Sequence, residues 1–338
     1  MDSLKLKPTK RIDDALVKLK EGSDVRGLSV LHQHHHHSIV LIVYLTEKSL
    51  ELFHFNINVY KTLKYAKIPL QLGKLGYREQ LLTVQHLNPA YIGVKTNQNI
   101  LAVYSLKTKK LVLEIKHPAQ STGILSFFTN KPISLYSCFL GDQVITWAEN
   151  STKLCFWELS KKSKSENALT LTATPSSHYA LIENRNLLIL QVDNFKYLEI
   201  IDLVKRTSLK TIPWDPDMKL TAPSTEENIY FFFESDMQGT TTIQIFALSL
   251  NESLEFARVL SPYNHCGPCA NFSVLAGGKY VTISDIRKAK LIDFSGESPQ
   301  PYHLSRRDCF DVRGFIKIKG RKLVFAPGKD GSVWIWRL

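Results

Sequence analysis

One apolar segment recurs seven times along the 338-residue chain and limits the folds open to it. In each copy apolar residues alternate with others, as in a half-buried strand, and a bulky residue stands two places before the last. Asp330-Gly331, a dipeptide typical of tight hairpin turns, precedes the final copy. The copies are 44 to 53 residues apart and end at Phe55, Leu106, Leu159, Leu203, Leu248, Phe294 and Leu338.

A period of this length with several short strands is typical of a β-propeller blade. We therefore predict an all-β fold, a seven-bladed β-propeller of four-stranded blades, as a single domain over residues 15–338 after a basic tail of residues 1–14. Because the chain stops at a third strand, the N-terminus must supply the outer strand of the last blade. We expect residues 15–20 (ALVKLK) to do so, with residues 3–7 as the alternative and residues 12–21 then helical.

The recurring segments resemble the third strand of a WD repeat. The Trp-Asp position of that repeat is taken by Trp157-Glu158, Ile201-Asp202, Ile292-Asp293 and Trp336-Arg337. No copy carries the dipeptide intact, and no Gly-His pair opens a repeat. The resemblance covers nearly the whole chain in its period and implies a degenerate WD-like propeller, which indicates fold far more than function.

Composition limits the setting. No apolar run is long enough for a membrane span, and the N-terminus lacks the apolar centre of a secretory signal. The five cysteines are an odd number without framework spacing, which favours a reducing, intracellular compartment. The net charge of +12 favours a polyanionic or acidic partner, and we expect the nucleus or nucleolus rather than the cytoplasm.

Several local patterns have a structural interpretation. The aromatic run 230–233 predicts an inner strand buried on both faces, and Trp214 predicts a plug between blades rather than an exposed contact. Five histidines, His32 and His34 to His37, are interpreted as a polar loop. Residues 68–80 and 117–131 exceed the mean repeat and predict longer connections.

Cys266 and Cys269 form a CxxC pair in the expected connection between blades five and six. With Cys309 and His303, or His265, they form a candidate zinc set, but free loop cysteines are the favoured interpretation. We expect neither a metal nor a cofactor to be needed for folding.

The sequence contains no nucleophile elbow, phosphate loop, HExxH motif or carboxylate pair with a plausible base, which favours a non-catalytic protein. We expect a scaffold or adaptor subunit of a stable intracellular complex with other protein subunits and without a membrane. The basic composition favours a complex containing RNA or DNA, such as one in ribosome biogenesis or RNA modification. The alternatives are a direct nucleic-acid binder and a propeller enzyme whose residues come from separate blades.

Basic residues are concentrated in the turns after the third strands of blades two, three and four, whereas Glu252 and Glu297 stand in those turns of blades five and six. A further basic turn is expected between the first two strands of blade seven, on the same face. We predict that these residues form a crescent that contacts phosphate or an acidic protein segment, the alternative being ordinary solvated turns. The crescent comprises Lys107, Lys109, Lys110, Lys161, Lys162, Lys164, Lys205, Arg206, Lys319, Arg321 and Lys322.

Overall fold

The computed structural model forms two compact units. The first comprises Met1–Lys7, Ala148–Leu154 and Leu169–Asp311, and the second Pro8–Trp147, Cys155–Ala168 and Val312–Leu338. The structure describes residues 4–6, 10–12, 27–32, 39–45, 49–56, 58–59, 61–70, 81–88, 90–96, 100–116, 135–149, 151–164, 168–220, 229–237, 240–258, 263–266, 271–275, 280–284, 289–294, 296, 298–304, 314–318, 321–327 and 333–337.

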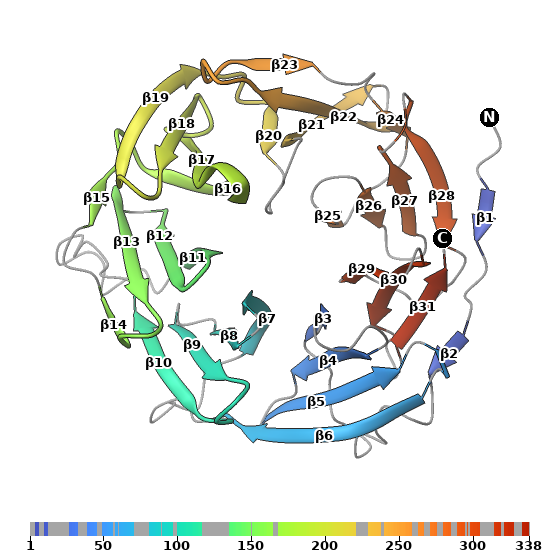
Figure 1. Ribbon diagram of the computed structural model, residues 1–338. Coiled ribbons are helices and arrows are strands. Elements are labelled where there is room, and N and C mark those ends of the chain that lie inside the picture. Colours follow the sequence, from blue (N-terminus) through green and yellow to red (C-terminus); the bar gives the residue numbers. More distant parts are fainter. Residues whose placement is uncertain are drawn as a thin grey trace, which may run out of the picture. The chain divides into compact units, whose positions relative to one another are not determined.

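The second unit holds four sheets, in each of which strands that follow one another along the chain lie side by side (Figure 1). They are β3 (Gly27–His32), β4 (Ile39–Leu45), β5 (Ser49–Asn56) and β6 (Lys61–Pro69); β7 (Leu81–Asn88), β8 (Tyr91–Thr96), β9 (Ile100–Ser105) and β10 (Leu111–Lys116); β11 (Leu135–Leu140), β12 (Gln143–Ala148), β13 (Lys153–Glu158) and β14 (Ser163–Lys164); and β29 (Gly314–Ile318), β30 (Arg321–Pro327) and β31 (Val333–Arg337) with β2 (Lys10–Ile12). The boundary between the units runs through β13, whose first residues pair with β15 (Leu169–Thr170).

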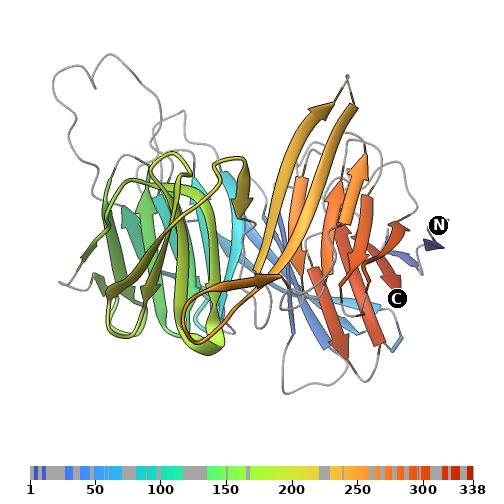
Figure 2. The same cartoon turned by 90° about the horizontal axis from the view of Figure 1, so that it is seen from above.

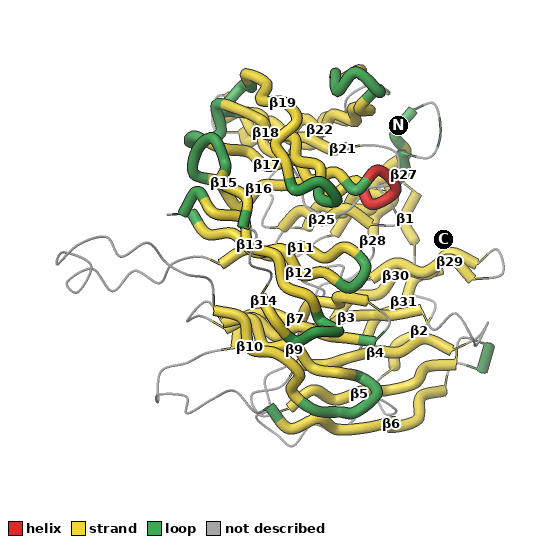
Figure 3. The backbone as a smooth tube through the Cα atoms, turned by 60° about the vertical axis from the view of Figure 1, so that its left-hand side comes forward, coloured by secondary structure: helices red, strands yellow, loops and turns green. Residues whose placement is uncertain are grey.

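The first unit holds three sheets, and its one described helical turn is η2 (Glu183–Arg185), red in Figure 3. The longest strands of this unit, β21 and β22, form a hairpin that reaches beyond the neighbouring strands in Figure 2. The sheets are β16 (Pro175–Ile182), β17 (Leu187–Val192), β18 (Tyr197–Asp202) and β19 (Thr207–Pro213); β20 (Met218–Leu220), β21 (Ile229–Met237), β22 (Thr240–Leu250), β23 (Phe256–Arg258) and β24 (Tyr263–Cys266); and β25 (Asn271–Leu275), β26 (Tyr280–Ser284), β27 (Ala289–Asp293) and β28 (Gln300–Leu304) with β1 (Leu4–Leu6).

Every recurring segment forms the third strand of a sheet, namely β5, β9, β13, β18, β22, β27 and β31. The residue that ends the segment recurs for a physical reason. Leu106, Leu159 and Leu203 are buried, and each donates its N–H to the residue just before the second strand of its sheet, at 2.8, 3.0 and 2.9 Å. The final Leu therefore packs into the core and also ties the third strand to the first hairpin.

The third strand β9 is buried on both faces by its neighbours, which explains its apolar character. In the second unit, Ala102 and Tyr104 of β9 pack toward the β3–β6 sheet, whereas Leu101 and Val103 pack toward the β11–β13 sheet. The C-terminal sheet of this unit lies against its first sheet, where the rings of Phe55 and Phe325 meet edge to face at 6.5 Å.

The sheets of the first unit are joined by side chains that bond across them. Gln191 of β17 is fully buried; its amide donates to the Met218 carbonyl and accepts from the Leu220 N–H, each at 2.8 Å. Trp214 also donates to the Met218 carbonyl, at 3.1 Å, and its ring lies tilted against that of Phe256, with the centroids 5.4 Å apart. This packing between two sheets agrees with the prediction that Trp214 is a plug.

The N-terminal segment contains strands, not only the basic tail expected for residues 1–14. Lys10–Ile12 pairs with Val333–Ile335 of β31, and so occupies the edge that we assigned to residues 15–20, which lie outside the described residues. Leu4–Leu6 pairs with β28 in parallel, so the alternative strand at residues 3–7 exists but belongs to a different sheet.

The aromatic run lies in β21, a second strand flanked by β20 and β22, which makes it an interior strand of its sheet. Of the longer connection expected at residues 68–80, Ile68 and Pro69 instead belong to β6, and residues 71–80 lie outside the described part of the chain, as do residues 117–131 of the other. No helix among the described residues is long and apolar enough to cross a membrane.

Candidate basic interface

Three turns that follow third strands carry a basic residue at the same backbone position. Lys109, Lys162 and Arg206 each stand three residues after the buried Leu and have φ of 57°, 53° and 55°. This left-handed conformation suits glycine, and a side chain at Cβ is disfavoured there. Turn geometry therefore does not account for the choice of a cation in three successive repeats.

The turn between β9 and β10 has the highest charge of the three. Lys107, Lys109 and Lys110 are exposed, and the turn has no acidic residue. Its backbone is held by Ser105, whose carbonyl accepts from the Lys109 N–H at 2.9 Å and whose hydroxyl accepts from the Thr108 N–H at 3.1 Å.

The turn between β13 and β14 is partly neutralised. Lys161 pairs with Glu158 at 2.6 Å, although the lysine side chain remains 70% exposed. Asp142, which is not part of this turn, holds its backbone: the Asp142 carboxylate accepts the Ser160 N–H at 3.0 Å. Lys164 lies in β14, opposite Trp157.

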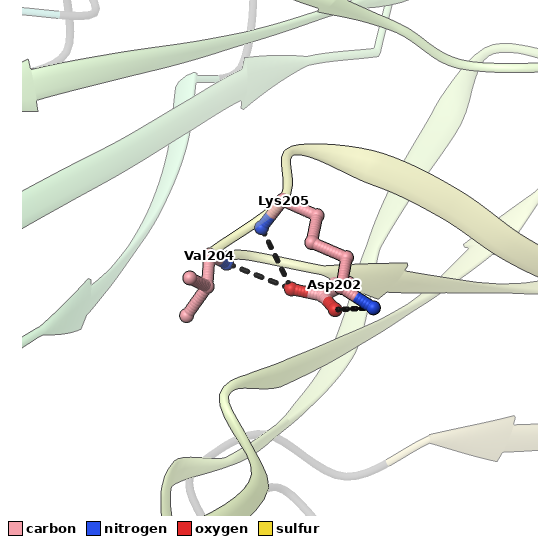
Figure 4. A network of polar contacts seen from close by, with 3 residues as sticks. All are labelled: Asp202, Val204 and Lys205. Carbon is pink, nitrogen blue, oxygen red and sulfur yellow. Dashed lines mark hydrogen bonds and ion pairs between the residues drawn. The ribbon is translucent and has the colours of Figure 1, made fainter.

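The turn between β18 and β19 is organised by Asp202 at the Trp-Asp position of the repeat. One carboxylate oxygen accepts the N–H groups of Val204 and Lys205 at 2.9 and 2.8 Å, and the other lies 3.9 Å from the Lys205 ammonium (Figure 4). Lys205 is still 73% exposed. Such exposed pairs contribute little to stability, so the cations stay available for other anions.

The Trp-Asp position is also structured in the third sheet. The indole N–H of Trp157 donates to the Thr146 hydroxyl at 2.9 Å, a buried bond between the third and second strands. Trp157 and Asp202 thus supply, in separate repeats, the anchor of the strand and the cap of the turn.

The basic residues expected in a turn of the last repeat lie partly in a strand. Arg321 and Lys322 begin β30, opposite Ile318 and Lys317, and Lys319 lies outside the described residues. The turns at 105–110 and 158–164 belong to neighbouring sheets of the second unit, whereas the turn at 202–207 belongs to the first unit. The crescent as a whole stays a prediction.

The candidate zinc set is revised. Cys266 is the last residue of β24 and pairs opposite Thr242, so it lies in a strand and not in the expected connection. His303 lies within β28, between Lys290 of β27 and Lys5 of β1. Cys269 and Cys309 lie outside the described residues. Among the residues that are described, no group of three or more potential ligands is arranged to hold a metal ion.

The sequence matches no protein-family model and no curated protein. The fold, in contrast, is matched by 1002 chains of solved structures, so it is too widespread to specify a function. One of them belongs to a crystal structure of a mitotic checkpoint complex; it is 10% identical, with a TM-score of 0.57, over 100% of this chain and 94% of that chain. The likeness and the recurring third strands together show a WD-repeat-like β-propeller fold.

Proposed function

We propose that this protein is a non-catalytic scaffold subunit of a multi-protein complex, built as one seven-bladed propeller domain to which the N-terminal strands β1 and β2 also belong. Its basic turns bind a multiply charged anionic partner. A rigid array of sheets with turns on its faces offers several docking surfaces at once. The matched checkpoint complex is itself an assembly, which supports a role of this kind.

The observation that carries the proposal is the cation at the left-handed position of three successive turns. Glycine would fit that position with less strain, so the basic side chain has to be explained by something other than the backbone. Because the turn backbone is already fixed, only the side chain of the cation loses conformational freedom on binding, which favours recognition of carboxylate or phosphate groups.

The test is a charge reversal of the basic turns. Replacing Lys107, Lys109, Lys110, Lys161, Lys162, Lys164, Lys205 and Arg206 by Glu should leave the melting temperature within a few degrees and abolish co-purification of partners. Lys153→Glu with Lys196→Glu is the control, because both lysines are exposed and lie outside these turns. Retention of all partners by the eight-residue variant would disprove the proposal.

A further inference from the structure

The hairpin of β18 and β19 exposes aliphatic side chains beside its cations. Among the large apolar residues whose exposure the structure describes, four are exposed, and three of them lie on this hairpin: Val204 at 71%, Leu209 at 42% and, at the start of β18, Tyr197 at 38%. Exposed apolar residues that occur singly need no explanation, but Val204 precedes Lys205 in the turn and Leu209 lies three residues after Arg206, so apolar and cationic side chains share one hairpin.

Val204 is not required by the turn. The residue that follows the buried Leu is Lys107 in the β9–β10 turn and Ser160 in the β13–β14 turn, and both turns reach the same left-handed conformation three residues after the Leu. An aliphatic side chain at this position is therefore particular to the fourth repeat.

The turn holds Val204 away from the core. Its N–H is bound by the Asp202 carboxylate, and Figure 4 shows its side chain pointing away from the Lys205–Asp202 pair. Because the backbone is fixed before any partner arrives, contact with Val204 costs little ordering entropy.

Leu209 is exposed for a different reason. In the β18–β19 ladder Ile200 pairs with Lys210 and Ile201 with Ser208, so Leu209 is the extra residue of a β-bulge. The bulge interrupts the regular edge of β19, and the strand ends at Pro213, which has no N–H to donate. Both features oppose the addition of a partner strand, so a partner would have to contact side chains.

We propose that this hairpin binds an acidic protein segment that carries an aliphatic side chain among its carboxylates; the inference rests on the proposed function of the basic turns. Lys205 and Arg206 pair with the carboxylates, and Val204 and Leu209 bury the aliphatic group. Charge complementarity alone would suit RNA equally well. Single-stranded RNA, however, gains its non-ionic contacts by stacking on aromatic rings or Arg. The hairpin offers Arg206 and, at the far end of β18, Tyr197 for stacking, whereas its two most exposed apolar side chains, Val204 and Leu209, are aliphatic and favour an aliphatic group.

The test compares three fluorescent probes: a peptide of alternating Glu and Leu, a peptide of the same length with alternating Glu and Ser, and an oligouridine of equal charge. The native protein should bind the Glu-Leu peptide about tenfold more tightly than the Glu-Ser peptide, the effect of partly burying aliphatic groups. Val204→Ser with Leu209→Ser should make the two affinities equal without lowering the melting temperature, since both side chains are exposed.

Two results would overturn the inference. One is an unchanged Glu-Leu affinity in the Val204→Ser, Leu209→Ser variant, and the other is tighter binding of oligouridine than of the Glu-Leu peptide. Lys205→Gln with Arg206→Gly removes the charge and leaves a residue that tolerates the left-handed conformation, and it should weaken both peptides. If the eight-residue charge reversal leaves all three probes bound as before, the proposed function fails together with the inference.

Discussion

The proposed function rests mainly on basic residues in an unusual backbone conformation. Lys109, Lys162 and Arg206 adopt a positive φ that a β-branched residue would resist and glycine would not. The sequence does not reveal this, because lysine gives no turn signal of the kind that glycine or asparagine gives.

Lys162 tests whether the backbone needs the cation. Lys162→Gly should leave the free energy of unfolding unchanged or raise it by up to about 1 kcal/mol, whereas Lys162→Val should lower it by about 1–2 kcal/mol. Chemical denaturation measures both. A loss on substitution by Gly as large as that by Val would show that the lysine side chain is itself structural.

His178 lies where two sheets of the first unit meet. Its Nδ1 is 2.8 Å from the Leu220 carbonyl, and its ring lies 5.5 Å from that of Phe195 and 6.1 Å from that of Phe232. Burial lowers the pKa of His178 from its ordinary 6.5; the hydrogen bond to Leu220 opposes this shift, and the charge of Lys219 adds to it.

Since the folded protein disfavours protonated His178, the unfolded chain binds more protons below pH 6.5. The stabilising contribution is therefore present above that pH and is lost as the pH falls. We expect the free energy of unfolding to decrease between about pH 7.5 and about pH 5.5, and to decrease less in His178→Gln. Parallel pH profiles for the two proteins would contradict this assignment.

At the scale of elements, the third strands could be predicted from the sequence, whereas the strands added at the edges of the sheets could not. Six to eleven residues of apolar alternation are enough to define β9 or β22, whereas Lys10–Ile12 contains one apolar residue and has no period. Its strand exists because the edge of β31 is open to pairing, a tertiary cause. Cys266 lies outside its expected connection for a similar, tertiary reason, since β24 adds to a sheet that already has an outer strand, β23.

Truncation separates the two N-terminal strands. Deleting residues 1–7 removes β1 alone, whereas deleting residues 1–14 also exposes the edge of β31, which carries the fully buried Ile335 and Trp336. The longer deletion should melt at least about 3 °C below the shorter one in a thermal scan. Identical melting temperatures would show that β2 does not stabilise the last sheet.

At the scale of the whole molecule, the charge is distributed unevenly. The net charge is +12, and the β9–β10 turn has three exposed lysines without a carboxylate, whereas the β22–β23 turn carries exposed Glu252 and Glu255. Fields of this kind steer an anionic partner to one region and make its association sensitive to salt. The positions of these turns could be predicted from the sequence because the turns recur with the repeat. The chemistry of the partner could not, because it depends on residues such as Val204 that do not recur.

We expect protein partners to dock on the basic turns. The most direct measurement is affinity purification of the native protein and of the eight-residue Glu variant after exhaustive nuclease treatment, with identification of the proteins retained. A set of partners should survive nuclease with the native protein and disappear with the variant. Loss of every partner from the native protein on nuclease treatment, or full retention by the variant, would contradict the claim.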